Sequence, residues 1–466
     1  MTIASELGQR VTQLQFDTLP DEAVYSAKMA ILDAVGVTLA GSLEPAPRIV
    51  RRVLRIADCG GKALIFGTDH RTSSLNASLV NGTASHVLDF DDCSNTMGGH
   101  PSVPILAALF ALADERSVSG RDFIVAYVAG YETETRVARG VNFYHYEKGW
   151  HPTATLGTFG AAAASAKLLA LDAERISIAL ALGVSMAAGV KANFGTMTKS
   201  FHVGQCSRNG VLAALLADEG FTANPEAFEH KQGFLTVFNG PRDFDAAKIL
   251  DHWADPLDII KPGVAIKQYP CCGSTHPAVD AMIEIHDAHE IDPDKVAKVV
   301  VWVHPRRLAH TNRPEPHSAL EAKFSVQYCA ARALMHGKVT LEHFQGDAYR
   351  DPDVVRLLQR VQAAPYTEKQ FDSANHFGGE AKVTMKDGRT YCAKVDSALG
   401  RTSTNPIPLD RLRMKFENCA GRALSSAAIE KSYLFVSQLE RLSDMRELTS
   451  IMALGLKPSN TVSLPG

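Results

Sequence analysis

The feature that most constrains the fold is a set of long stretches made almost entirely of small and apolar residues. They lie within the first 265 residues, at 103–113, 159–170, 176–190 and 210–217. Helices that are rich in Ala and Gly on all sides can pack closely and are usually buried. No strand–helix alternation and no glycine-rich phosphate-binding motif interrupts these stretches. This part of the chain is therefore predicted to be an all-helical domain, with an early helix capped at Asp21 and ending at Gly41.

The sequence changes character after residues 261–263. Residues 298–304 are β-branched and predict a strand, and residues 381–385 and 390–395 flank a Lys-Asp-Gly-Arg turn that predicts a hairpin. Helices are predicted between them, at 277–289, 324–335 and 351–362, and again near the C-terminus, at 429–442 and 445–454. The predicted fold class is mainly α, with a helical domain formed from both chain ends (1–265 and 401–466) and an inserted α+β domain (266–400).

Composition excludes several classes of partner. The chain has 466 residues, with 48 basic against 51 acidic side chains, and a net charge of −3 gives no electrostatic footprint for nucleic acid or an anionic membrane. No apolar run approaches the roughly 18–20 residues of a membrane span, and no signal peptide is recognisable. The eight cysteines include no C-x-x-C pair, which is typical of reduced thiols. A cytoplasmic enzyme is the leading interpretation.

Ionisable residues inside apolar stretches identify the candidate site, because burying them is costly unless they have a role. Asp89, Asp91 and Asp92 precede a Gly-Gly-His-Pro turn that carries His100. A carboxylate can orient an imidazole, so His100 is a candidate acid or base. The alternative, with about equal weight, is that the aspartates cap the following helix and His100 is an ordinary loop residue.

Three further segments carry candidate groups. Tyr146 and His151 could line a pocket, whereas Tyr144 and His145 are better explained as part of a surface loop. Lys199 is expected in a polar loop between apolar helices, where it could act as a base or remain solvated, and Arg208 is expected to begin the next helix. Lys267, Tyr269, Cys271 and Cys272 lie at the predicted domain boundary, and the two thiols are interpreted as structural.

Metal and serine-hydrolase chemistry find little support. His286 and His289 could share a helix face, but neither H-E-x-x-H nor a Cys/His finger spacing is present. A G-x-S-x-G elbow is also missing from the sequence. No metal and no cofactor are predicted.

Several segments, in their order along the chain, resemble the MmgE/PrpD family. The resemblance covers roughly residues 20–450. It is carried by Ile31-Leu32-Asp33-Ala34-Val35-Gly36, Asp89-Phe90-Asp91-Asp92, His100-Pro101-Ser102, His151-Pro152, Lys199 with His202-Val203-Gly204, Lys267-Gln268-Tyr269-Pro270, and Ser325-Val326-Gln327-Tyr328.

The resemblance implies a two-domain homodimer whose active site lies between the domains and acts on small polycarboxylates without a metal. Reactions of this family are expected to pass through a carbanion next to a carboxylate, which requires a base and positive donors. It implies Lys199 as acid/base on one face of the substrate and His100 or Tyr146 on the other, with Asp89 orienting His100. The implied substrate-binding residues are His151, Lys267, Tyr269 and Tyr328.

The resemblance favours one branch of the family. Cys93 stands where the dehydratases and decarboxylases usually have threonine, and residues 196–210 are more similar to the epimerase branch. The implied activity is cofactor-independent epimerisation of iminodisuccinate. The alternative is dehydration or decarboxylation of a small tricarboxylate of the 2-methylcitrate or cis-aconitate type. A non-catalytic carboxylate-binding protein is disfavoured, because the ionisable clusters are intact.

Overall fold

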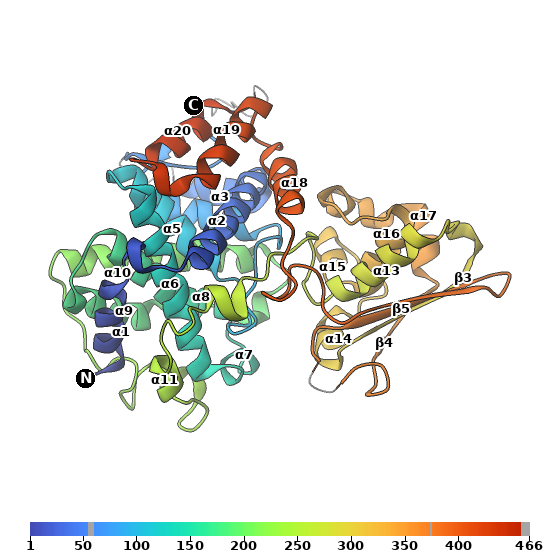
Figure 1. The fold of residues 1–466 in the computed structure, drawn as a ribbon, viewed down its shortest axis with the longest axis horizontal. Coiled ribbons are helices and arrows are strands. Elements are labelled where there is room, and N and C mark those ends of the chain that lie inside the picture. The colour runs from blue at the N-terminus through green and yellow to red at the C-terminus, as the bar shows by residue number, and fades with distance from the viewer. Residues whose placement is uncertain (55–59, 373–374, 458–466) are drawn as a thin grey trace. The chain divides into compact units, whose positions relative to one another are not determined.

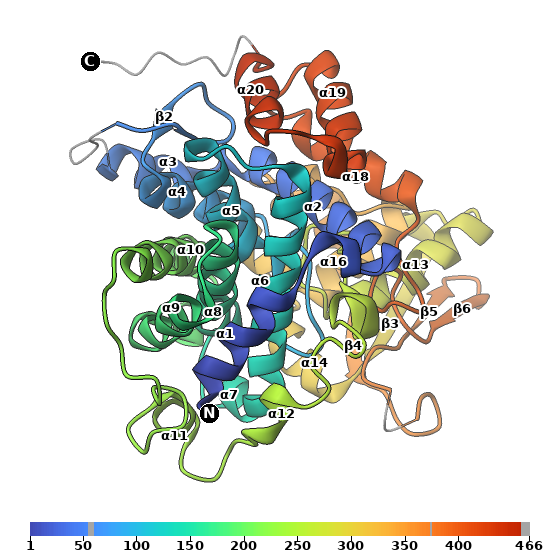
Figure 2. The same cartoon turned by 60° about the vertical axis from the view of Figure 1, so that its left-hand side comes forward.

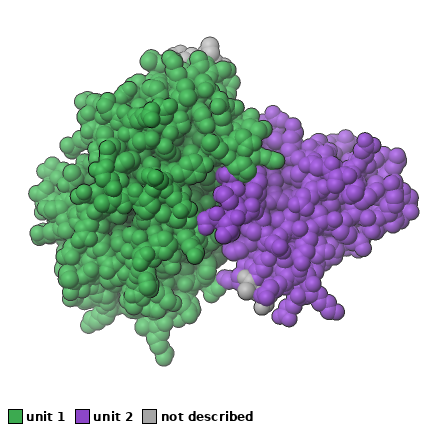
Figure 3. Space-filling view, viewed as in Figure 1, with its two compact units in different colours: residues 1–266, 408–466 green, residues 267–407 purple. Residues whose placement is uncertain are grey.

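A computed structural model describes residues 1–54, 60–372 and 375–457, and within it the chain divides into two units. The first unit contains residues 1–266 and 408–466, and the second contains residues 267–407 (Figure 3). The inserted domain is predicted from the sequence at 266–400. Cys59, one of the eight cysteines predicted to be reduced, lies outside the described residues.

Helices build the first unit (Figure 1). The longer ones before the second unit are α1 (Ile3–Gln13), α2 (Asp21–Gly41), α3 (Pro45–Leu54), α4 (Ser74–His86), α5 (Ser102–Glu115), α6 (Gly120–Val141), α8 (Pro152–Leu168), α9 (Ala173–Met186) and α10 (Met197–Asp218). Those after it are α18 (Leu409–Ala420), α19 (Ser426–Ser437) and α20 (Arg446–Leu454). A two-stranded sheet, β1 (Ala63–Leu64) with β2 (Arg71–Thr72), corrects the all-helical prediction in detail.

The small-residue stretches are mostly buried helices, as the sequence predicts, but the stretch 176–190 is helical only to Met186 and its last residues are largely not buried. Helices α8, α9 and α10 lie side by side (Figure 2). At the crossing of α4 and α10, Gly82 and Gly204 face each other, and a Cβ at Gly204 would lie 2.2 Å from the Leu79 carbonyl oxygen. Such close helix contact needs a position without a side chain. The crossing matters for function because α4 ends at His86 and α10 begins near Lys199.

A Gly204→Ala substitution is expected to destabilise the protein by about 1–3 kcal/mol, because the added methyl group cannot fit without separating the two helices. Chemical denaturation measures the change. Gly183→Ala in α9 is the matched control, since its Cβ would lie 3.3 Å from the Phe159 ring, which can move. Equal stability of the two variants would contradict the close packing of α4 on α10.

Helix α2 differs from the prediction at its start. Asp21 is the first helical residue and Pro20 is the N-cap, without a side-chain cap hydrogen bond. Its carboxylate instead lies in the first turn, where negative charge is favourable. The helix is long and apolar enough to cross a membrane by composition, but most of it is buried in the first unit, where it packs against α4 and α18.

The second unit contains a four-stranded sheet in the order β4-β3-β5-β6. Strands β3 (Val296–Val303), β5 (Gly379–Met385) and β6 (Thr390–Val395) are antiparallel neighbours and confirm the predicted strand and hairpin. The predicted helix at 351–362 is wrong in its second half. Helix α17 (Pro352–Leu358) ends early, and β4 (Val361–Pro365) pairs in parallel with β3. Pairing of Val361 with Val299 outweighs the local helical pattern.

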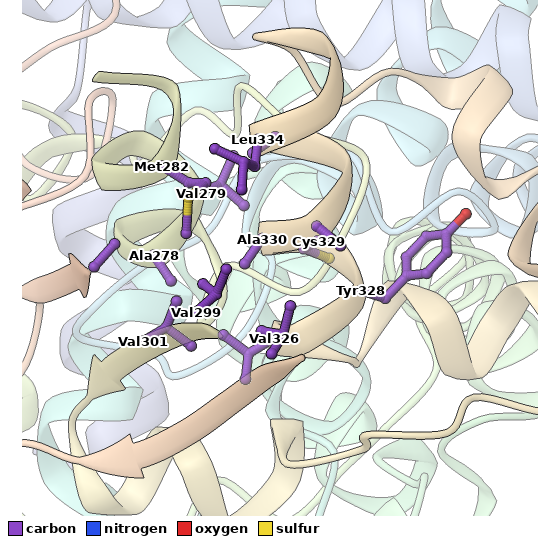
Figure 4. Close-up of a cluster of buried hydrophobic side chains, with 14 of the residues drawn as sticks. Ala278, Val279, Met282, Val299, Val301, Val326, Tyr328, Cys329, Ala330 and Leu334 are labelled. Atoms are coloured by element: carbon purple, nitrogen blue, oxygen red, sulfur yellow. The ribbon is translucent and has the colours of Figure 1, made fainter. Parts of the chain in front are cut away.

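Helices α13 (His276–Ala288) and α16 (Val326–His336) pack against each other and against this sheet. Val279 and Met282 of α13 meet Val299 and Val301 of β3 in an apolar core (Figure 4). Two further α-helices of the unit are short, namely α14 (Pro305–Thr311) and α15 (Ala319–Lys323). This core gives the inserted segment its own hydrophobic centre.

Candidate active site

A buried carboxylate, Asp91, joins two histidines between α4 and α5. Its Oδ2 atom accepts from His86 Nδ1 at 2.8 Å and from His100 Nδ1 at 3.0 Å. An ionised carboxylate has no proton to donate, so both rings carry their proton on Nδ1 and turn Nε2 away from Asp91. His86 is the last residue of α4, whereas Asp91 and His100 belong to the loop that follows.

Burial and charge set the protonation states of this group. Burial by itself would raise the pKa of Asp91, but the adjacent His100 and His86 rings hold it well below its usual range. Burial lowers the pKa of His86 to about 3, a larger effect than the opposing field of Asp91. At neutral pH the group therefore contains an ionised Asp91 and a neutral His86.

A second carboxylate, Asp89, joins His100 to Lys199. The Lys199 ammonium donates to Asp89 Oδ1 at 2.6 Å, and His100 Nε2 lies 3.7 Å from the same oxygen. The three side chains are buried or nearly so. The sequence prediction assigns the orientation of His100 to Asp89. In the structure the shorter contact comes from Asp91, and Asp89 instead links the imidazole to the lysine.

Lys199 lies in the first turn of α10, which corrects its predicted place in a loop. Thr196 is the N-cap and accepts from the Thr198 amide, so the polar residues that suggest a loop begin a helix. Positive charge is unfavourable at a helix N-terminus, and the contact with Asp89 offsets this. Arg208 does not begin a helix either, because it lies in the middle of α10.

His151 is the N-cap of α8 and contacts a further histidine. Its Nδ1 atom lies 3.2 Å from His202 Nδ1, its ring lies 5.7 Å from the His86 ring, and it meets the Phe194 ring edge-on. Burial, together with the nearby cationic groups, lowers the pKa of His151 well below its usual value. His151 is therefore a neutral donor or acceptor beside His86 and His202, within the electrostatic influence of Lys199.

Tyr146 lies in the short helix α7 (Tyr144–Glu147) beneath a second lysine. Lys191 Nζ stands 3.5 Å from the centre of the Tyr146 ring, and burial lowers the pKa of this lysine. Tyr144 is exposed, as predicted. His145 is not part of a surface loop, because it is fully buried between Asn239 and Thr155.

The other predicted substrate-binding residues belong to the second unit. Lys267 is its first residue and is buried. The Tyr269 hydroxyl donates to Asp280 at 2.5 Å. The Tyr328 hydroxyl donates to the His343 carbonyl at 2.5 Å and accepts from Arg332 at 3.0 Å, an arrangement typical of a structural tyrosine. The substrate-binding roles of these three residues stay predictions.

His86, Asp89 and His100 are spaced so that they could contact one cation, with ligand atoms within 4.8 Å of one another. The histidine pair that the sequence suggests for a metal is a different one, His286 and His289, and His286 contacts Asp287 at the surface. The Lys199 ammonium already supplies positive charge to Asp89, so a metal would have to displace it. The predicted absence of a metal stays a prediction.

Sequence reasoning did not single out His86 or Lys191, and it named Asp91 and His202 only within motifs, without their contacts. His86 lies five residues before Asp91, within the same polar cluster, and this proximity is the signal that could have identified it. Cys93, singled out from the sequence, has its Sγ atom 4.0 Å from His100 Nδ1.

A buried set of carboxylates, imidazoles and a lysine between helices has the groups that acid–base chemistry needs. Comparison with protein families matches the MmgE/PrpD N-terminal domain to residues 5–247 and the MmgE/PrpD C-terminal domain to residues 269–441. The chain therefore belongs to the MmgE/PrpD family.

Its relatives include enzymes of two reaction types. It is 30% identical to cis-aconitate decarboxylase of Homo sapiens, over 97% of this chain and 94% of that protein. The Mus musculus cis-aconitate decarboxylase is also 30% identical, over 97% and 93%. The mitochondrial 2-methylcitrate dehydratase of Yarrowia lipolytica is 22% identical, over 78% and 74%.

Proposed function

We propose that this protein is a lyase that decarboxylates a small unsaturated tricarboxylate of the cis-aconitate type. The observation that carries the proposal is the buried series Lys199–Asp89–His100–Asp91, which pairs a cationic proton donor with an oriented imidazole. The two cis-aconitate decarboxylases named above also support the proposal, because they are similar to this chain over nearly its whole length.

The chemistry needs one bond broken and one proton delivered. In an allylic tricarboxylate, loss of CO2 from the CH2-carboxylate leaves its electron pair in the allyl system. The double bond shifts, and a proton is added at the distal carbon. Lys199 is the proposed proton donor, since it is an ammonium within 2.6 Å of Asp89. The step removes no proton from the substrate, so Lys199 regains its proton from solvent after the transfer. The proposed role of His100, whose Nε2 lies 3.7 Å from the same Asp89 oxygen, is to hold Asp89 and the substrate in place.

A substrate with three negative charges has to be recognised by a few individual cationic side chains, since the chain as a whole carries a net charge of −3. Lys199 and Lys191 supply positive charge in the first unit. Neutral His151 can donate a hydrogen bond to a carboxylate. Lys267 is the residue of the second unit that we propose to bind a substrate carboxylate.

Epimerisation of iminodisuccinate, the activity favoured by sequence resemblance, is the second candidate. Cys93 beside His100 supports it, as does the presence of two proton-transfer groups, which an epimerase needs on opposite faces of the substrate. The comparisons favour the lyase, because the relatives named above carry out decarboxylation and dehydration. Homodimer formation and a cytoplasmic location stay predictions.

Parallel assays in deuterated water separate the candidates. With cis-aconitate, we expect CO2 release and one solvent deuterium in the dicarboxylate product, because the new C–H bond takes its hydrogen from an exchangeable group. With 2-methylcitrate, a dehydratase would instead produce a rise in ultraviolet absorbance. With iminodisuccinate, an epimerase would change optical rotation and place deuterium at Cα. Inertness toward cis-aconitate together with turnover of either other substrate would contradict the proposal.

A further inference from the structure

A lysine from the C-terminal part of the chain reaches the loop that carries the catalytic carboxylates. Lys415 of α18 donates to the Phe90 carbonyl oxygen at 2.7 Å, and its Nζ lies 3.9 Å from the centre of the Phe90 ring. Lys415, Phe90 and their neighbours Asp89 and Asp91 are all buried. The contact is therefore shielded from water, and a charge-assisted hydrogen bond is strong in such surroundings.

The same ammonium is paired with a carboxylate from α2. Asp33 Oδ1 lies 2.6 Å from Lys415 Nζ, and both side chains are almost fully buried. Burial raises the pKa of Asp33 to about 6, although Lys415 acts in the opposite direction. A buried ion pair adds little stability compared with apolar residues of similar volume, so stability alone does not account for it.

The contact with Lys415 matters because Phe90 lies between the two aspartates of the site. Its carbonyl lies between two carboxylates that point to different partners, Asp89 toward Lys199 and Asp91 toward His86 and His100. Asp89 has a φ of 53°, a left-handed conformation that is uncommon for residues other than glycine, although aspartate tolerates it better than most. A fixed Phe90 carbonyl restricts the backbone on both sides of it.

We propose that Lys415 is a positioning residue, held by Asp33, which fixes the Phe90 carbonyl and so aims Asp89 and Asp91 at the lysine and the histidines of the site. This positioning role rests on the proposed function, because it requires the site to be catalytic. It does not depend on which substrate the wild type converts.

The test separates positioning from simple stabilisation. Lys415→Met removes the ammonium and is expected to lower kcat about 100-fold with KM changed less than threefold, because a displacement of about 1 Å in the acid–base groups has that effect. Lys415→Met/Asp33→Asn also removes the stranded carboxylate and is expected to recover stability but not kcat. Lys415→Arg keeps the charge and is expected to restore part of kcat.

Lys28→Met is the matched control. Lys28 also bridges a backbone carbonyl and a carboxylate, those of Ser437 and Glu440, but not at the aspartate loop. It is expected to leave kcat unchanged. Proton NMR of the imidazole Nδ1–H signals of His86 and His100 provides a readout without turnover, and Lys415→Met should shift both.

The outcomes are distinguishable. A folded Lys415→Met/Asp33→Asn variant with wild-type kcat and unchanged imidazole signals would overturn the positioning role. A wild-type protein without turnover on the three substrates would overturn the proposed function, while the imidazole signals would still test the effect of Lys415 on the site.

Discussion

Replacing Lys199 by alanine is expected to lower kcat by about three orders of magnitude or more, with a folded protein remaining. General acid–base catalysis by one placed side chain contributes about 10²–10⁴-fold, and Lys199 also supplies positive charge to the developing carbanion. Its removal additionally leaves Asp89 without its partner at 2.6 Å. Steady-state rates on the substrate that the wild type converts, combined with thermal unfolding, measure both effects.

Two comparison variants sharpen this expectation. Lys199→Arg keeps the charge but holds its proton too tightly to donate it, so substrate binding should survive while kcat stays low. Lys167→Ala is the control, because Lys167 is a half-buried lysine that donates to the Thr12 carbonyl at 2.9 Å. It should retain wild-type kcat. Near-normal turnover of Lys199→Ala would remove this lysine from the proposed mechanism.

The fold was predictable where local sequence decides it. Small-residue stretches specify buried helices such as α8, and the Asp387-Gly388 turn between two strands that alternate in burial specifies the β5–β6 hairpin. Residues 361–365 were not predictable in this way. Their strand exists because β3 offers a parallel partner, and that neighbour is remote in sequence.

The site was predictable as a set of residues and not as a set of contacts. Asp89, His100 and Lys199 do lie together, but spacing alone could not show which aspartate faces which ring. That choice depends on the left-handed backbone at Asp89, which turns Asp89 and Asp91 toward different partners. The pairing of Lys415 with Asp33 joins opposite ends of the chain and leaves no local signal.

Asp91→Asn is expected to lower kcat about 10²–10⁴-fold with a much smaller effect on KM. The Asp91 carboxylate accepts from both His86 and His100, and it fixes the tautomer in which His100 Nε2 faces Asp89. Both rings contact Oδ2, so an amide oxygen in that place could still accept from both. It lacks, however, the negative charge that favours a protonated imidazole, and the amide nitrogen would replace the buried Oδ1, which has no hydrogen-bond partner among the described residues. Loss of an orienting carboxylate has an effect of this size in other acid–base sites. Steady-state kinetics with unfolding controls would measure it.

Asp92→Asn makes the same chemical change at the next residue and is expected to leave kcat within a fewfold of wild type. Burial raises the pKa of Asp92 to about 8, so this side chain is protonated at neutral pH and already resembles an amide in charge. It is hydrogen-bonded to Ser102, which in turn contacts Tyr127.

The raised pKa of Asp92 also makes stability depend on pH. Between the ordinary pKa of 3.8 and about 8, the folded wild type holds a proton that the unfolded chain has lost. Wild-type stability should therefore fall, relative to Asp92→Asn, as the pH rises through this window.

The comparison of kcat decides how Asp91 acts. Equal losses of kcat in Asp91→Asn and Asp92→Asn would mean that Asp91 acts only through packing of the loop, and not through the proton it holds on His100.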